Sequence, residues 1–175
     1  MRWQKRVAMS DRLINVLFLC THNSARSVMA EALLNTLGRG RFHAYSAGSM
    51  PSGRLNPFAI EMAKTIGYAT ENVCSKSWDE FATPGAPKMD IVITVCDNAA
   101  NEMCPIWPTQ NGQVPAIAHW GFPDPSTTVG GDDDKRIAFQ AVFNAIREHI
   151  QLLVNLPMEN RERHVLAKEL MRIHT

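Results

Sequence analysis

The feature that most constrains this chain is a short apolar strand that ends at a cysteine and is followed by a tight loop and a helix. Residues 16–19 are four apolar residues without a polar break, which predicts a buried strand that stops at Cys20. From Arg26 onward apolar residues recur at helical spacing, and Gly38 is a suitable end for that helix. The sequence therefore places Cys20 and the five residues after it between the end of a strand and the start of a helix.

The loop between Cys20 and Arg26 has the properties of an oxyanion site. Successive backbone N–H groups and the positive end of the helix dipole are expected to face a bound anion there. Arg26 adds a planar guanidinium that can bind two oxygens of a tetrahedral oxyanion. The same positive environment predicts a lowered pKa for the Cys20 thiol, and a thiolate beside a bound oxyanion is a nucleophile. We expect the anion to be held by Thr21, His22, Asn23, Ser24, Ala25, Arg26 and Ser27.

The rest of the chain alternates between strands and helices. Further strands are predicted over 41–47, 89–96 and 114–119, and helices over 57–66, 77–81, 132–153 and 159–174. The apolar positions of the last two helices include Ile137 and Val165, whereas residues 97–108 break the pattern. This alternation predicts an α/β fold, a three-layer sandwich around a four-stranded, mainly parallel sheet. Because parallel strands end at the same edge of a sheet, Cys20 and Cys96 are expected to lie together.

Length and composition limit the class of protein. With 175 residues the chain suits one domain, assigned to 13–156, with a loosely ordered basic leader over 1–12 and an amphipathic helix over 157–175 that packs on the domain. The 18 basic and 17 acidic residues nearly balance, which gives no indication of a nucleic-acid or membrane partner. No apolar run approaches the length of a membrane span, and the leader lacks the apolar core of a secretory signal, so a cytoplasmic protein is expected.

The four cysteines are Cys20, Cys74, Cys96 and Cys104. In a reducing cytoplasm such thiols are catalytic, metal-binding or inert more often than paired in structural disulfides. The spacing of Cys96 and Cys104 is a poor match to a zinc site and no pair of histidines lies close by, so neither a metal nor a cofactor is predicted. On this reasoning alone, Cys96 could equally be a small buried residue that ends a strand, and Cys104 an incidental loop thiol.

The Cys20 loop, with its cysteine, five residues and Arg26-Ser27 after the first strand, resembles the low-molecular-weight protein tyrosine phosphatase family. Within that fold, residues 95–105 followed by 119–122 are similar to the arsenate reductases. The resemblance implies a flavodoxin-like strand order of 2-1-3-4. Many of the phosphatases carry a glycine and a second cysteine inside the loop, where this chain has His22 and Ala25.

The resemblance also implies roles for single residues. Both families place a catalytic aspartate in a late Asp-Pro loop, which maps onto Asp124, although local sequence alone favours an ordinary turn there. Asn23 and Ser46 match positions that hold the loop rigid. Lys76 falls near a position where some of these reductases have an acidic ligand for potassium, so no ion is predicted.

The mechanism that the resemblance implies is a relay of three thiols. Cys20 attacks arsenate held by the loop, Asp124 protonates the departing oxygen, and phosphate or sulfate competes as an anion. Cys96 then attacks the sulfur of Cys20 and releases arsenite, after which Cys104 attacks Cys96 by thiol–disulfide exchange. Thioredoxin is the implied reductant of the final disulfide, with glutaredoxin and glutathione, or mycothiol, as the alternative.

Two other functions fit parts of the sequence. A phosphatase acting on phosphotyrosine or a small phosphoester would use the same loop, but the phosphatases commonly have tyrosine after their Asp-Pro pair, where this chain has Ser126-Thr127. A thiol-based redox sensor, or an oxyanion-binding module, would need Cys20 and would require neither Asp124 nor a third cysteine. Cys74 is given no role in any of these interpretations.

Overall fold

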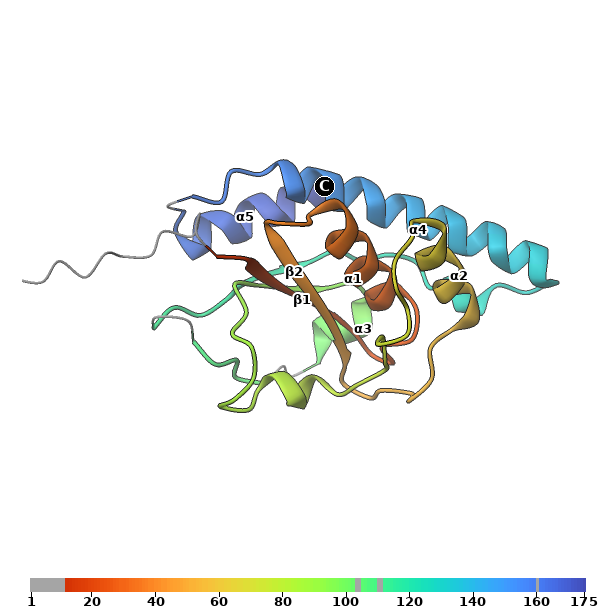
Figure 1. Ribbon diagram of the computed structural model, residues 1–175, viewed down its shortest axis with the longest axis horizontal. Helices are drawn as coiled ribbons and strands as arrows, with labels where there is room; N and C mark the ends of the chain where they lie inside the picture. Colours follow the sequence, from red (N-terminus) through yellow and green to blue (C-terminus); the bar gives the residue numbers. More distant parts are fainter. Residues whose placement is uncertain (1–11, 103–104, 110–111, 160) are drawn as a thin grey trace, which may run out of the picture.

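The computed structural model describes residues 12–102, 105–109, 112–159 and 161–175, which form a four-stranded sheet with helices around it (Figure 1). The strands are β1 (Ile14–Cys20), β2 (Phe42–Gly48), β3 (Ile91–Thr94) and β4 (Ala116–His119), in the order β2-β1-β3-β4. The helices are α1 (Arg26–Leu37), α2 (Pro57–Thr65), α3 (Asp97–Asn101), α4 (Asp132–Asn155) and α5 (Arg163–His174), with 3-10 turns η2 (Trp78–Phe81) and η3 (Pro125–Thr127). Every neighbouring pair of strands is parallel, which confirms the predicted fold class and strand order.

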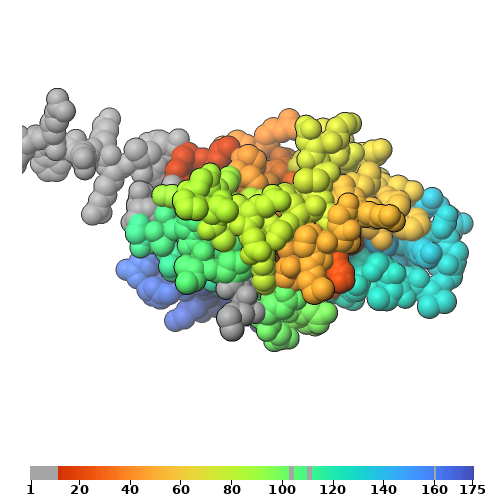
Figure 2. All heavy atoms as spheres, turned by 90° about the horizontal axis from the view of Figure 1, so that it is seen from below, coloured from red at the N-terminus to blue at the C-terminus, as the bar shows by residue number. Residues whose placement is uncertain are grey.

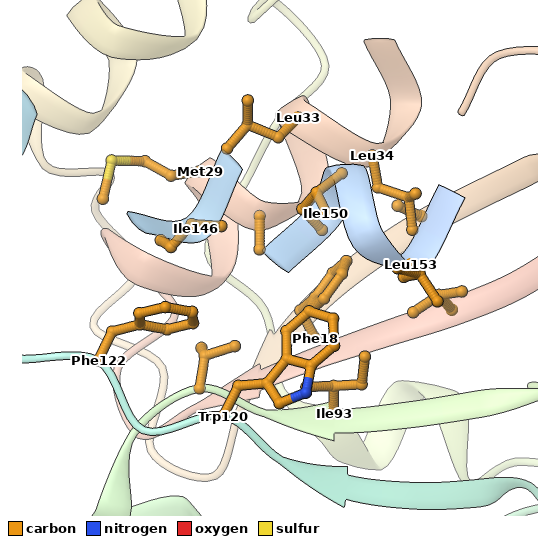
Figure 3. Packing of buried hydrophobic residues seen from close by; sticks show 14 of the residues in the cluster. Phe18, Met29, Leu33, Leu34, Ile93, Trp120, Phe122, Ile146, Ile150 and Leu153 are labelled. Carbon is orange, nitrogen blue, oxygen red and sulfur yellow. The ribbon is translucent and has the colours of Figure 1, made fainter. Parts of the chain in front are cut away.

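The larger core lies between the sheet and the helical layer that contains α1 and α4. Phe18 of β1 and Ile93 of β3 point toward Leu33 of α1 and toward Ile146 and Ile150 of α4 (Figure 3). All five side chains are fully buried, and burial of each such side chain contributes about 1.5–3 kcal/mol to folding. This packing fixes the axis of α1 against the sheet and so fixes the loop that joins it to β1.

The opposite face of the sheet is covered by a thinner layer. Leu17, Leu19 and Val92 point into a second cluster, which includes two aromatic residues of η2, Trp78 and Phe81. The segment that contains η2 crosses this face in yellow-green in Figure 2. Because β1 and β3 are buried on both faces, the apolar runs 16–20 and 91–93 within them show no polar alternation.

Two parts of the chain differ from the sequence-based predictions. Residues 97–101, within the stretch where the pattern breaks, form the short helix α3. Ile137 and Val165, assigned to the apolar stripes of the last two helices, are 70% and 38% exposed. Ile137 lies in the first turns of α4, ahead of the buried stripe, which starts at Phe139 where the helix meets its neighbours.

The last helix, α5, packs on β4 and α4 and buries Leu166 and Leu170. Trp120 Nε1 donates a hydrogen bond of 2.8 Å to the carbonyl of Leu170. At the start of the helix, Arg163 Nη2 lies 2.8 Å from the buried carboxylate of Asp90, next to β3. No helix within the described ranges is long and apolar enough to cross a membrane.

Candidate active site

The carboxyl ends of β1 and β3 bring Cys20 and Cys96 to the same edge of the sheet. Cys20 is the last residue of β1, and Cys96 comes two residues after the end of β3. The Val95 N–H donates to the Leu19 carbonyl at 2.8 Å, so the two strands stay paired up to the residue before each cysteine. Both cysteine side chains are buried on the helical side of the sheet. The juxtaposition predicted from the strand ends is confirmed.

The loop after Cys20 is held by its carbonyl groups. Backbone N–H groups of the segment 49–56 donate to four of these carbonyls at 2.9–3.3 Å, those of Cys20, Thr21, His22 and Ser24. No side chain caps α1, and within the described part of the chain no protein acceptor is hydrogen-bonded to the backbone N–H groups of residues 22–26. These N–H groups lie at the positive end of α1, so the loop has the donors that a tetrahedral oxyanion needs.

Asn23 fixes the shape of this loop from inside. Its side chain is fully buried, and its backbone adopts the left-handed conformation with φ of 48°, which asparagine tolerates better than most residues. Asn23 Nδ2 donates to Ser27 Oγ at 2.9 Å, and Asn23 Oδ1 accepts the Lys76 N–H at 2.9 Å. One side chain therefore ties the loop both to the start of α1 and to the chain beyond α2.

Gly48, at the end of β2, lets the loop rest against the sheet. A Cβ atom at this position would lie 2.4 Å from the Thr21 carbonyl oxygen and 3.0 Å from the Asn23 nitrogen. Any larger residue would push the loop away from β2. The need for glycine comes from this close approach of two backbone segments.

Arg26 and Asp124 face each other across the loop. Arg26 Nη2 lies 3.4 Å from Asp124 Oδ2, and Arg26 Nη1 donates to the Phe122 carbonyl at 3.0 Å. Asp124 Oδ1 also accepts the Ser126 N–H at 3.0 Å and the Ser126 hydroxyl at 2.7 Å. Burial alone would raise the pKa of Asp124, but the Ser126 hydrogen bonds and the charges of Arg26 and His22 lower it overall. Without a bound anion, Asp124 is a carboxylate.

The thiols of Cys20 and Cys96 lie close enough for each to change the pKa of the other. Contact with the Cys96 thiol, followed by burial, raises the pKa of Cys20, and the nearby charge of Arg26 does not offset the two. Contact with the Cys20 thiol, against the effect of burial, lowers the pKa of Cys96 to about 5. The predicted lowering of the Cys20 pKa is therefore wrong, because contact with the second thiol and burial raise it.

Cys96 has further partners besides Cys20. Its Sγ accepts the Ala99 N–H at 3.4 Å and so caps the start of α3. Thr21 Oγ1, from the anion loop, lies 3.6 Å from Cys96 Sγ and 3.4 Å from the Glu102 carboxylate. The Ala99 N–H favours the thiolate form of Cys96, and so does the Thr21 hydroxyl when its single proton points to Sγ and not to Glu102. Loop and second thiol therefore form one hydrogen-bonded unit.

The structure brings together most of the residues singled out in the sequence. Cys20, Cys96, Arg26 and Asp124 converge with the loop residues, whereas Cys74 is exposed and Cys104 lies outside the described residues. Sequence reasoning missed two supporting residues, Gly48 and the half-buried Glu31, which accepts the Ser46 hydroxyl. Nothing in the local sequence marks them, because each acts through contacts that only the fold creates.

Comparison with known proteins gives a consistent result. The family model described as low molecular weight phosphotyrosine protein phosphatase matches residues 15–168. An arsenate reductase from Halalkalibacterium halodurans is 35% identical over 136 residues, which are 78% of this chain and 91% of that protein. A glutaredoxin arsenate reductase from Synechocystis sp. is 30% identical over 139 residues, or 79% of this chain and 95% of the other.

Solved structures show the same similarity. An arsenate reductase in the phosphate binding state superposes with a TM-score of 0.63 at 28% identity, covering 81% of this chain and 97% of its own. A thioredoxin-dependent arsenate reductase from Corynebacterium glutamicum superposes with a TM-score of 0.54 at 26% identity, covering 81% of this chain and 63% of its own.

Proposed function

The chain belongs to the low molecular weight phosphotyrosine protein phosphatase family, and we propose that within it the protein is an arsenate reductase. In this proposal it reduces arsenate to arsenite and takes both electrons from its own cysteine thiols. Cys20 is the nucleophile, Cys96 is the second thiol, and the loop 21–27 with Arg26 holds the anion.

One observation carries the proposal: a second buried thiol lies next to the nucleophile, at the paired ends of β1 and β3, beside an anion loop. A phosphatase that works through a cysteinyl-phosphate needs one thiol, and water completes the reaction. Reduction of arsenic(V) to arsenic(III) needs two electrons, which two thiols supply when they become a disulfide. The position of Cys96 against Cys20 meets that requirement and has no use in simple hydrolysis.

The first step joins Cys20 to arsenic. Cys20 passes its proton to the neighbouring Cys96 thiolate, and Cys20 Sγ then attacks arsenic to form an S–As bond. One arsenate oxygen leaves as water after it receives a proton. The proposed donor of this proton is Asp124, whose carboxyl lies 3.4 Å from Arg26 in the anion site. Bound arsenate adds negative charge beside Asp124 and engages Arg26, and both changes raise the pKa of Asp124 toward that of a proton donor.

The second step reduces arsenic. Cys96 loses its proton again, helped by the Ala99 N–H at the start of α3, and its Sγ attacks Cys20 Sγ. The S–S bond forms as the S–As bond breaks, and the electron pair of that bond stays on arsenic. Arsenic leaves as arsenite, arsenic(III), and the two thiols have become the Cys20–Cys96 disulfide.

The last step restores the enzyme and involves Cys104. We propose that Cys104 attacks Cys96, which frees Cys20, and that thioredoxin reduces the Cys96–Cys104 disulfide in the cytoplasm. Support for this choice comes from the third cysteine, since a route that ends on glutathione does not need it. Among the similar proteins are both a thioredoxin-dependent and a glutaredoxin arsenate reductase, so the reductant has to be tested directly.

The test replaces each cysteine by serine and follows arsenate-dependent oxidation of reduced thioredoxin. Cys20→Ser and Cys96→Ser should abolish turnover, Cys104→Ser should stop it after one cycle, and Cys74→Ser, at an exposed position, is the matched control. Full multiple turnover by Cys104→Ser would reject the three-thiol relay and favour glutaredoxin or mycothiol. Rapid hydrolysis of an aryl phosphate without any response to arsenate would make the protein a phosphatase.

A further inference from the structure

A histidine that takes no part in the reaction above holds the backbone on both sides of Cys96. His119, the last residue of β4, hydrogen-bonds through Nδ1 to Thr94 Oγ1 at 2.8 Å and through Nε2 to Asp97 Oδ1 at 2.9 Å. Thr94 comes two residues before Cys96, and Asp97 comes directly after it. One imidazole therefore connects the two ends of the turn that carries the second thiol.

The chemistry of the three groups sets the direction of the hydrogen bond to Asp97. A carboxylate only accepts, so Nε2 of His119 carries a proton and donates it to Asp97. Nδ1 accepts the proton of the buried Thr94 hydroxyl in a neutral ring and donates to the same oxygen in a protonated ring, so this contact holds Thr94 in either form. His119 thus bonds one polar group on each side of Cys96.

The surrounding backbone is arranged to make room for this pair. A Cβ atom on Gly121 would lie 2.7 Å from Asp97 Oδ1 and 3.1 Å from His119 Nε2, so only glycine leaves the pair undisturbed. The same segment continues the pairing with β3, since the Trp120 N–H donates to the Thr94 carbonyl at 2.8 Å. The imidazole therefore stands on a fixed backbone, and its position is defined relative to Cys96.

We propose that His119 is a positioning residue for Cys96: by holding Thr94 and Asp97, it keeps the Cys96 thiol against Cys20 while the S–S bond forms. The inference rests on the proposed arsenate reduction, because only there does Cys96 act as a nucleophile. Within the described ranges, none of the hydrogen bonds of His119 reaches Cys20, the anion loop or Arg26. Loss of the His119 side chain should weaken the positioning of Cys96 against Cys20 and leave anion binding unchanged.

The proximity of the two thiols can be measured without arsenate. In a Cys74→Ser, Cys104→Ser background, equilibration with reduced and oxidised glutathione gives the effective concentration of Cys20 and Cys96 toward each other. His119→Ala should lower it about tenfold, the effect of one to two lost hydrogen bonds, and should slow arsenate-driven loss of two thiols in the full chain by a similar factor. Asp97→Ala should act in the same direction, and Asp97→Asn, which keeps an acceptor, should recover most of the loss.

Two controls separate positioning from general damage. His174→Ala removes a ring 6.3 Å from that of His119 which makes no hydrogen bond to Thr94 or Asp97 among the described residues, and it should behave as wild type. The affinity for inorganic phosphate, measured by calorimetry, should be unchanged in His119→Ala because it reports only on the anion loop.

An unchanged effective concentration in His119→Ala, or a parallel loss of phosphate affinity, would overturn the role of His119. Failure of the proposed function has a separate signature, namely wild-type protein that loses no thiols when arsenate is added.

Discussion

Replacing Asn23 with alanine should destabilise the fold and weaken anion binding at the same time. The Asn23 side chain is 0% exposed, donates to Ser27 Oγ at 2.9 Å and accepts the Lys76 N–H at 2.9 Å. Alanine removes both hydrogen bonds and leaves the Lys76 N–H and the Ser27 oxygen without that partner. It also has to keep the backbone of residue 23 at φ of 48°, in the left-handed region.

The expected magnitude follows from these losses. A buried group that loses its only partner costs about 1–3 kcal/mol, and a left-handed residue other than glycine or asparagine costs about 1–2 kcal/mol. With the Lys76 N–H as the buried group that loses its partner and residue 23 as the left-handed residue, the total for Asn23→Ala should be about 2–5 kcal/mol. That is a large part of the roughly 5–15 kcal/mol by which a domain of this kind is stable.

Urea denaturation followed by tryptophan fluorescence gives the free energy of unfolding, and two further variants separate the contributions. Asn23→Asp keeps an acceptor for the Lys76 N–H and tolerates the left-handed backbone, so it should lose less than half as much. Asn23→Gly relieves the backbone but loses both hydrogen bonds, so it should fall between the two. An alanine variant within about 1 kcal/mol of wild type would refute the reasoning, since the two hydrogen bonds would then have little net value.

Three other predictions concern different parts of the molecule. Gly48→Ala should weaken binding of inorganic phosphate at least about tenfold by calorimetry, because the added carbon would lie 2.4 Å from a loop carbonyl oxygen; unchanged affinity would contradict this close approach. A third prediction concerns pH. At pH values between the folded Cys96 pKa of about 5 and its ordinary pKa of 9.0, the two thiols together bind one proton in the folded protein and two protons in the unfolded chain. The free energy of unfolding should therefore rise with pH across this window and fall above it, and Cys96→Ser should remove the rise. Asp90→Asn should lower the free energy of unfolding, measured in urea, by about 3–5 kcal/mol, because it breaks the ion pairs of a buried carboxylate with Arg12 and Arg163. Its phosphate affinity should be unchanged, because Asp90 lies at the opposite end of β3 from the anion loop.

Much of the fold could be predicted because segments that are buried in the fold are apolar in the sequence. Strands covered on both faces, such as β1 and β3, contain unbroken apolar runs, 16–20 and 91–93. Because parallel strands end at the same edge of a sheet, these runs then place Cys20 near Cys96. The strand–loop–helix unit around Cys20 was equally visible, since the loop is short and α1 begins at Arg26, as predicted. These features depend on residues that are adjacent in the chain.

The features that the sequence did not reveal depend on residues that meet only in the fold. α3 has five residues, too few for a helical period, and its cap is a cysteine thiol in place of the usual hydroxyl or carboxylate. The pKa of Cys20 was predicted from local positive charge, but its contact with Cys96, 76 positions away, has the larger effect. The clash that requires Gly48 is likewise a contact between two segments, and no local pattern reports it.

The segment from His119 to Asp124 links the two halves of the proposed reaction. At one end His119 holds Thr94 and Asp97 around the second thiol, and at the other Arg26 is bonded to the Phe122 carbonyl and paired with Asp124. When arsenate binds, Arg26 must exchange these protein partners for arsenate oxygens, and Asp124 then loses a positive neighbour.

The pKa of Asp124 rises at that moment, so the carboxyl becomes a proton donor only when there is an oxygen to protonate. In the same loop, the arsenylated sulfur of Cys20 no longer carries a proton. In the proposed reaction, the Ala99 N–H and the Thr21 hydroxyl would then be the groups that favour the attacking Cys96 thiolate. In the proposed reaction the anion would therefore trigger both steps, because its binding changes the partners of Asp124 and its attachment to Cys20 changes the partners of Cys96.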